Sequence, residues 1–339
     1  MPELSSSSGI LISPSLSSLP PELKLKIAEE VAAFKSHPFL NLAPGEVVAP
    51  EKLVADKMTL AALSRTSREW HTLTVPFLFE AFTLTRKLVL SSDYLFHSVL
   101  EPYGHLVRSL IVGQGVIQSP LVRSRMQAIV DVVPNLASLS LSCDFPESLP
   151  VLSRPAPITS LNLKLYQGYP SQAFLDPFVA TLETLRLSTA PVVNIEPPAP
   201  YVLPHVTTLE LDYSNPPYFP PFARLPLEHL SFRSLYMYRD LLSETRPSLG
   251  LFLNQLKPTI RSLVFQWPNV SITASKYALA EDTLDGLSKL CKERGIEVVL
   301  PNIKVVETPP ESDEEEDDSD DDHDEDDWDA IYWEEEMMW

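Results

Sequence analysis

The residue types that most often carry chemistry are scattered along this chain and do not stand at the spacings that build a site. The seven histidines are His37, His71, His97, His105, His205, His229 and His323. None has a second histidine four residues away, and neither cysteine has a partner at metal-ligand spacing. Gly113-Gln114-Gly115 lacks the third glycine of a dinucleotide-binding loop, and no phosphate-binding loop or G-x-S-x-G elbow occurs. The sequence therefore predicts a protein that is not an enzyme and uses no cofactor or metal.

A short apolar pattern, apolar-x-x-apolar-x-apolar, returns at least seven times along the middle of the chain. The copies are Val107-Leu110-Val112, Leu136-Leu139-Leu141, Ile158-Leu161-Leu163, Leu182-Leu185-Leu187, Val206-Leu209-Leu211, Leu227-Leu230-Phe232 and Ile260-Leu263-Phe265. Their starts lie 21 to 33 residues apart, close to the period of about 20–29 residues that is typical of leucine-rich repeats. We therefore expect an α/β fold of the irregular leucine-rich repeat solenoid type, a horseshoe whose open face binds another macromolecule.

Polar side chains alternate with the apolar ones in these copies. Successive side chains of a strand point to opposite faces, so the polar set is expected on one open face. That set is Ser140, Asn162, Lys164, Arg186, Glu210, Asp212, His229 and Arg233. We predict that it contacts a target protein, and its bases and acids lie on separate repeats, which suits a partner that carries both charges. The alternative is that each residue is an ordinary solvated strand position.

The segments between the copies are predicted to differ in structure. Residues 121–133 place apolar side chains on one side of a helix, and residues 240–256 and 282–293 are also expected to be helical. Residues 190–204 and 215–226 each contain five prolines, which block helix interiors and predict extended chain. Residues 296–300 are expected to add a closing strand.

Two helical segments and an exit segment precede the repeats. Leu19-Pro20-Pro21-Glu22-Leu23 opens the first helix, where prolines cost no hydrogen bond. Apolar residues then follow at helical spacing as far as Phe34. The second segment, residues 58–71, reads MTLAALSRTSREWH, and residues 75–84 read VPFLFEAFTL. Residues 35–57 lie between the first two segments, and three prolines and a glycine predict a loop there.

In this order and directly before the repeats, the three segments resemble the F-box of fungal F-box proteins with leucine-rich repeats. The resemblance implies that the helical unit docks on the SKP-type adaptor of a cullin–RING ubiquitin ligase, while the repeats hold the protein to be ubiquitinated. The adaptor-binding residues that it implies are Leu19, Pro20, Leu23, Ile27, Leu60, Leu63 and Trp70. The connection at residues 35–57 is longer than is usual in that family. The alternative is a helical cap that merely covers the first repeat.

The charge of the chain is concentrated at its C-terminal end. The formal net charge is −20, and residues 307–339 hold 19 of the 46 acidic residues and no Lys or Arg. Residues 1–306 therefore hold 27 acids against 26 bases, which gives no electrostatic reason to bind nucleic acid. Ser312 and Ser319 precede runs of acids and are candidates for phosphorylation by acidophilic kinases. Aromatic and apolar residues from Trp328 onward interrupt the acids, as in disordered binding segments.

These patterns divide the chain into four expected parts. They are a disordered N-terminus at 1–18, an F-box-like helical domain at 19–85, a leucine-rich repeat domain at 86–306 and a disordered acidic tail at 307–339. The expected function is that of a substrate-recognition adaptor that bridges an SCF-type ligase, with its SKP-type adaptor and cullin, to an unknown target protein. The alternative is a scaffold without ligase attachment, whose acidic tail binds basic proteins such as histones.

The expected location is the cytoplasm or the nucleus, without contact to a membrane. Cys143 and Cys291 lie far apart in the sequence. We therefore expect two reduced thiols rather than a disulfide, as is usual in these compartments. The N-terminus lacks the basic and apolar regions of a secretion signal, and no uninterrupted run of 18 apolar residues is present.

Overall fold

The structure is a computed structural model that describes most of residues 19–306. The described residues are 19–33, 50–85, 88–89, 91, 94–190, 199–213, 220–232, 252–253, 259–265, 270–300 and 303–306. The longer helices are α1 (Pro21–Ala33), α2 (Pro50–Ser64), α3 (Arg68–Glu80), α7 (Pro120–Asp131) and α10 (Ala274–Glu293). Short helical turns are η2 (Tyr94–Leu100), α5 (Glu101–Tyr103), η3 (Gly104–Leu106), α6 (Gln114–Ile117), η4 (Pro146–Ser148), α8 (Gln172–Leu175), η5 (Asp176–Phe178) and η6 (Pro220–Phe222). No helix within these ranges is long and apolar enough to cross a membrane.

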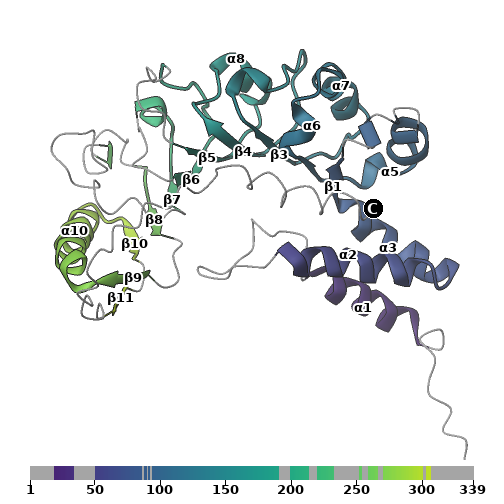
Figure 1. Ribbon diagram of the computed structural model, residues 1–339, viewed down its shortest axis with the longest axis horizontal. Helices are drawn as coiled ribbons and strands as arrows, with labels where there is room; N and C mark the ends of the chain where they lie inside the picture. The colour runs from purple at the N-terminus through teal and green to yellow at the C-terminus, as the bar shows by residue number, and fades with distance from the viewer. Residues whose placement is uncertain are drawn as a thin grey trace, which may run out of the picture.

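One parallel sheet of nine strands forms the centre of the molecule (Figure 1). Its strands are β1 (Ala81–Leu84), β2 (Ser109–Val112), β3 (Ser138–Cys143), β4 (Ser160–Gln167), β5 (Thr184–Ala190), β6 (Thr208–Tyr213), β7 (His229–Phe232), β8 (Ser262–Phe265) and β10 (Glu297–Val299), in that order. A second sheet pairs β9 (Val270–Thr273) with β11 (Ile303–Val306), also in parallel. Parallel strands need a crossover between them, and here each crossover leads to the next strand along the sheet.

The expected fold class is wrong. We predicted a helical F-box-like unit followed by an irregular leucine-rich repeat horseshoe, whereas the structure has a nine-stranded, all-parallel sheet with helices, an α/β fold. The strand β1 begins immediately after α3 and pairs with β2, so the helical residues continue directly into the sheet. The crossovers also do not repeat one structural unit. The crossover from β2 to β3 contains the 12-residue helix α7, whereas the crossover from β3 to β4 contains only the 3-10 turn η4.

The apolar copies form the buried rows of this sheet. In register, Leu110 pairs with Leu139, Leu139 with Leu161, and the same position continues to Leu263 in β8. The middle residue of every copy is at most 1% exposed. Each such side chain contributes about 1.5–3 kcal/mol through removal from water, so the aligned leucines fix both the register and the buried face.

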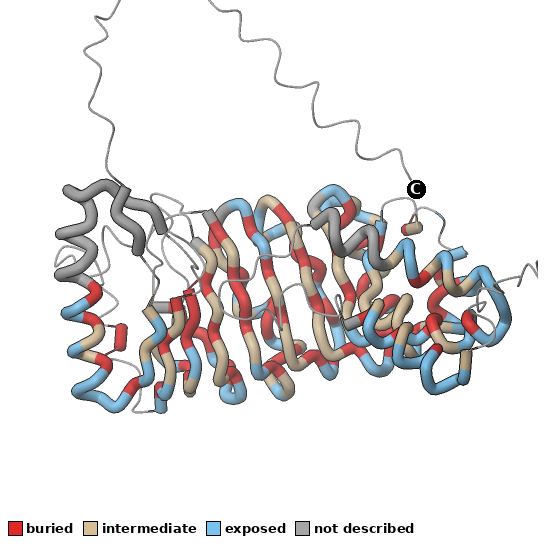
Figure 2. Tube along the Cα trace, turned by 90° about the horizontal axis from the view of Figure 1, so that it is seen from below, coloured by how far each residue is buried: buried red, intermediate tan, exposed pale blue. Residues whose placement is uncertain are grey.

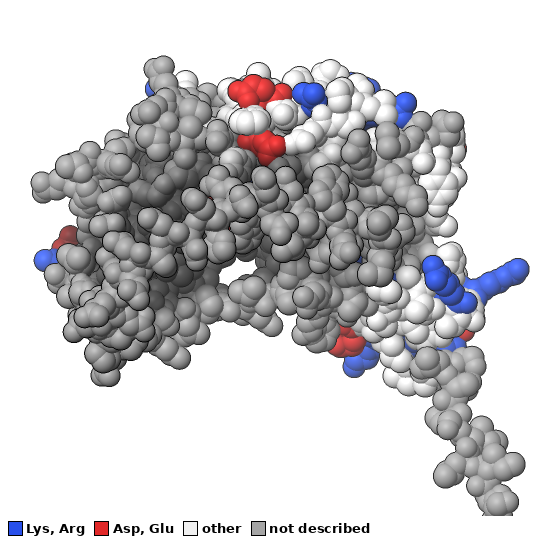
Figure 3. Space-filling model, viewed as in Figure 1, with Lys and Arg blue, Asp and Glu red and all other residues white. Residues whose placement is uncertain are grey.

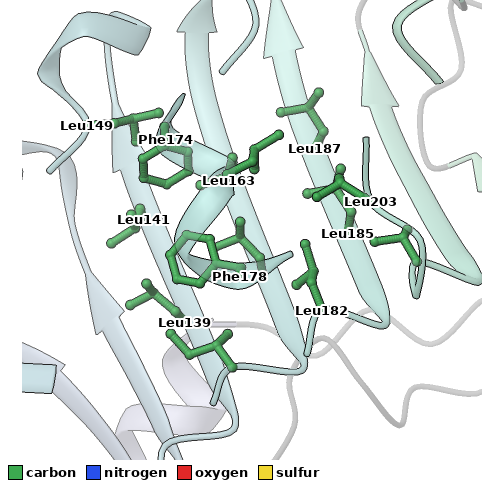
Figure 4. Packing of buried hydrophobic residues seen from close by; sticks show 14 of the residues in the cluster. Leu139, Leu141, Leu149, Leu163, Phe174, Phe178, Leu182, Leu185, Leu187 and Leu203 are labelled. Carbon is green, nitrogen blue, oxygen red and sulfur yellow. The ribbon is translucent and has the colours of Figure 1, made fainter. Parts of the chain in front are cut away.

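Aromatic side chains from the crossovers close the core over these leucines. Phe174 of α8 and Phe178 of η5 lie edge to face, with ring centroids 5.7 Å apart, against Leu139, Leu141 and Leu163 (Figure 4). Figure 1 shows α6, α7 and α8 on one side of the sheet. The apolar face is therefore the covered face, and the polar side chains of the strands point the other way.

Several predictions about single elements are confirmed. The helix expected at 121–133 is α7, the one expected at 282–293 is the second half of α10, and the closing strand is β10. Residues 199–204, the described end of the proline-rich segment 190–204, contain no helix. Of the helix expected at 240–256, only residues 252–253 are described, and they are helical.

Two element predictions need correction. The loop expected at 35–57 is too long, because α2 already begins at Pro50, where a proline in the first turn removes no helical hydrogen bond. Residues 34–49 lie outside the described residues. The second correction is the short turn η6 at Pro220–Phe222, inside the proline-rich segment 215–226. One 3-10 turn needs few backbone donors and so tolerates prolines.

Candidate functional site: two interaction surfaces

The helix α1 packs on its neighbours through a face that the sequence pattern did not single out. Ala28 and Ala32 are buried, and so is Lys24, whose Nζ lies 2.7 Å from Glu69 Oε2 on α3. The predicted stripe lies on a different side of the helix: Leu23 is 49% exposed and Ile27 is half-buried. The helix therefore keeps part of its apolar surface for solvent or for a partner.

The segment 63–71 forms the turn between α2 and α3. Ser67 is the N-cap of α3, and its Oγ accepts a hydrogen bond from the Trp70 amide at 3.2 Å. Ser64 Oγ lies 2.8 Å from His71 Nδ1 across the same turn. The spacing between Ser67 and Trp70 thus has a local structural cause, because Ser67 caps the helix that carries Trp70.

The seven predicted adaptor-binding residues fall into three groups. Leu60 and Trp70 are 2% and 1% exposed and belong to the core of the helical unit. Pro20 and Leu23 are exposed, while Leu19, Ile27 and Leu63 are half-buried. Leu25 of α1 and Met58 of α2 are also exposed apolar residues, and neither was among the predicted binding residues. The sequence feature that could have identified them is their position outside the apolar stripe. A large apolar residue is not needed for packing there.

The helical unit is held firmly against the start of the sheet. Glu80 ends α3 and Ala81 begins β1, so no linker separates them. Lys57 Nζ of α2 donates a hydrogen bond of 2.7 Å to the Ala81 carbonyl, and burial lowers the pKa of this lysine. The Phe79 ring is stacked on Tyr103, with centroids 4.3 Å apart. These contacts fix the direction of the helices relative to β1 and β2.

The second surface is the side of the sheet opposite the core, which we call the polar face. It carries Ser140, Asn162, Lys164, Arg186, Glu210, Asp212 and His229, as the alternation predicted. The last predicted member, Arg233, lies outside the described residues, as do Ser312 and Ser319. Figure 2 views the molecule from this side, where exposed and half-buried positions alternate with buried ones along the strands.

The polar side chains form hydrogen bonds from strand to strand. Ser140, Asn162, Arg186, Glu210 and Ser231 occupy one row across β3 to β7. Asn162 Nδ2 donates to Ser140 Oγ at 3.1 Å, and Arg186 forms an ion pair with Glu210 Oε2 through Nε and Nη2. In the neighbouring row, His229 Nδ1 lies 2.7 Å from Ser262 Oγ.

The charges of the polar face are therefore arranged differently from the expectation. Arg186 and Glu210 are both largely buried and neutralise each other across adjacent strands. Lys164 is exposed, and Tyr166, two residues further along β4 where its register with β5 shifts, is 64% exposed. Tyr166 was not among the residues predicted for this face, although the alternation of β4 extends to it. On the side drawn in Figure 3, the described basic and acidic residues lie in small separate groups.

The described residues hold no candidate metal site, and both of their cysteines are buried. No group of three His, Cys, Asp or Glu side chains there is placed to hold a metal ion. Burial raises the pKa of the Cys143 thiol to about 11, assisted by Asp144 and Glu147, and burial also raises the pKa of Cys291. Thiols in this state are protonated near neutral pH and react slowly.

Comparison with known proteins assigns no family to this chain. No protein-family model matches it, and no curated protein matches it significantly. Functional assignment therefore depends on the two surfaces themselves.

Proposed function

We propose that this protein is the substrate-recognition subunit of a cullin–RING ubiquitin ligase. In this proposal the helices α1 to α3 bind the SKP-type adaptor, and the polar face of the sheet binds the protein to be ubiquitinated. The chain acts as a bridge in the cytoplasm or nucleus and performs no covalent chemistry itself. It uses neither a cofactor nor nucleic acid.

The observation that carries the proposal is the unpartnered apolar side of α1. The helix uses Ala28 and Ala32 for its own packing, and Leu23 remains half exposed next to the exposed Pro20. Leu25 and Met58 of the same helical unit are exposed as well, and exposed apolar surface of this kind supports a binding role. The F-box-like order of these segments supports a SKP-type adaptor as the partner.

The junction between the helices and the sheet supports the bridging part of the proposal. A ligase subunit must hold its target at a defined place relative to the adaptor. Here Lys57 and the Phe79–Tyr103 stack join the two surfaces without a linker. A target on the polar face is then presented in a fixed direction.

The test is a pull-down of the full chain with a purified SKP-type adaptor. Wild-type protein is expected to bind, and Leu23→Ser is expected to reduce binding at least tenfold, because it removes an anchor from the apolar contact. Val151→Ser is the matched control: Val151 is an even more exposed aliphatic residue, located between β3 and β4. Its substitution should leave binding unchanged. Wild-type protein that does not bind the adaptor would overturn the proposal.

A second candidate function is a scaffold that binds basic proteins without a ligase. The observation in its favour is the tail at 307–339, with 19 acids and no base. In the same pull-down, a full chain that retains histones at physiological salt and ignores the adaptor would favour this candidate.

A further inference from the structure

Two residues in the middle of the polar face are buried although the described helices that pack on these strands lie on the other side. Arg186 is 6% exposed and Ser231 is 8% exposed, while α6, α7 and α8 cover the apolar face. Figure 2 shows the middle strands from the polar side with no described helix across them. The Ser231 hydroxyl is buried and has no hydrogen-bond partner. Buried hydroxyls in folded proteins usually have a hydrogen-bond partner, so this part of the polar face differs from an ordinary solvated sheet surface.

The chemistry of the face beside these residues is mixed. Lys164 presents an exposed cation, and Tyr166, two residues along the same strand at the point where its register with β5 shifts, presents an exposed aromatic ring. A cation next to an exposed aromatic ring suits a segment in which acidic residues flank aromatic ones.

The C-terminal tail has this composition. Between Trp328 and Trp339 the sequence is WDAIYWEEEMMW, with three tryptophans, a tyrosine and four acids. The preceding residues, 307–327, contain 15 acids and no base. Because the charges of this stretch repel one another, it favours extended chain that can act as a spacer.

The spacer is long enough to reach the face from where it starts. The tail begins after β11, which pairs with β9 beside β10, the last strand of the large sheet (Figure 1). Nine strands at about 4.8 Å separation span roughly 38 Å. Twenty-one residues extend to roughly 70 Å, so residues 328–339 reach every strand of the polar face.

We propose that residues 328–339 bind the polar face of their own chain around Lys164 and Tyr166. If the proposed function holds, the tail then occupies the surface that a target needs and acts as an intramolecular competitor. A target binds by displacing the tail, and phosphorylation in the spacer changes the charge of the competitor. The intramolecular contact itself depends on neither the adaptor nor a target.

The test is photo-crosslinking within the full chain, in the absence of adaptor and target. Tyr166 is replaced by a photoreactive phenylalanine, and crosslinked peptides are identified by mass spectrometry in an equal mixture of isotopically light and heavy protein. We expect crosslinks to residues 328–339 within chains of one isotope. The same probe at Val202, an exposed residue in the segment before β6, should give no such crosslinks.

Matched variants make the test specific for the face. Lys164→Glu should lower the crosslink yield at least fivefold through repulsion of the acidic segment. Lys289→Glu, an exposed lysine on α10, should leave the yield unchanged. Replacing the three tail tryptophans by alanine should lower it as well. No tail crosslink at position 166, light-to-heavy crosslinks in place of intramolecular ones, or equal yields for the two lysine variants would each overturn the proposal. Adaptor binding by the Lys164→Glu variant is scored separately and tests only the proposed function.

Discussion

At the scale of single residues, the Arg186–Glu210 pair is the contact that sequence alone did not reveal. Both residues were expected as separate charges on an open face, and their types were correct. The pairing depends on the register of β5 and β6, in which Arg186 stands opposite Glu210. Lateral neighbours in a sheet are 24 residues apart here, so no local pattern reports them. The alternation of side chains predicts which face of the sheet a residue lies on, but it does not predict which residue lies opposite on the neighbouring strand.

Replacing one member of the Arg186–Glu210 pair should lower the free energy of unfolding much more than replacing both members together. Arg186→Met or Glu210→Leu alone leaves a largely buried charge without its partner, which costs about 3–5 kcal/mol of unfolding free energy. The double variant should cost much less than the sum, because it leaves no charge buried. Urea unfolding of the four proteins measures this coupling. Lys164→Met, at an exposed position of the same face, should stay within about 0.5 kcal/mol of wild type. Additive single effects would show that the two charges do not stabilise each other.

At the scale of elements, the strands were more predictable than their assembly. The apolar pattern located seven of the strands because the buried leucines carry it directly, and α7 followed from its apolar side. The fold class was nevertheless wrong. The strand β1, with the sequence AFTL, carries no full copy of the pattern, so its place as the first strand of the sheet was not visible. The early start of α2 was missed because Pro50 was read as a loop residue rather than as a first-turn residue.

The turn between α2 and α3 gives a prediction at this scale. Ser67→Ala removes the N-cap oxygen that accepts the Trp70 amide, and it should lower the unfolding free energy by about 0.5–2 kcal/mol. Trp70 itself stays in place, so adaptor binding should weaken only slightly. Ser124→Ala is the control, since the Ser124 hydroxyl only bonds back to the Leu121 carbonyl within α7. Denaturant unfolding measures the free energy of unfolding of both variants. Equal losses of stability in Ser67→Ala and Ser124→Ala would show that the Ser67 cap does not stabilise α3.

At the scale of the whole molecule, the chain combines a nearly neutral folded part with a strongly acidic end. The described core consists of side chains from residues up to Leu300, and the closing strand β10 completes the sheet without the tail. The binding of residues 328–339 to the polar face is proposed as a reversible contact between exposed groups. Such a contact regulates access to a surface without being needed to form it.

Removal of the tail should therefore change the behaviour of the surface more than the stability of the fold. A chain that ends after Val306 should melt within a few degrees of the full chain, because about 1 kcal/mol shifts the melting temperature of a domain of this size by about 2–4 °C. The truncated chain should also be less soluble near neutral pH, since its 27 acids and 26 bases almost cancel. Calorimetry at matched salt measures the first effect, and light scattering during concentration measures the second. A loss of more than about 10 °C would mean that the tryptophans of the tail are part of the core, and the tail would then be a structural element rather than a displaceable competitor.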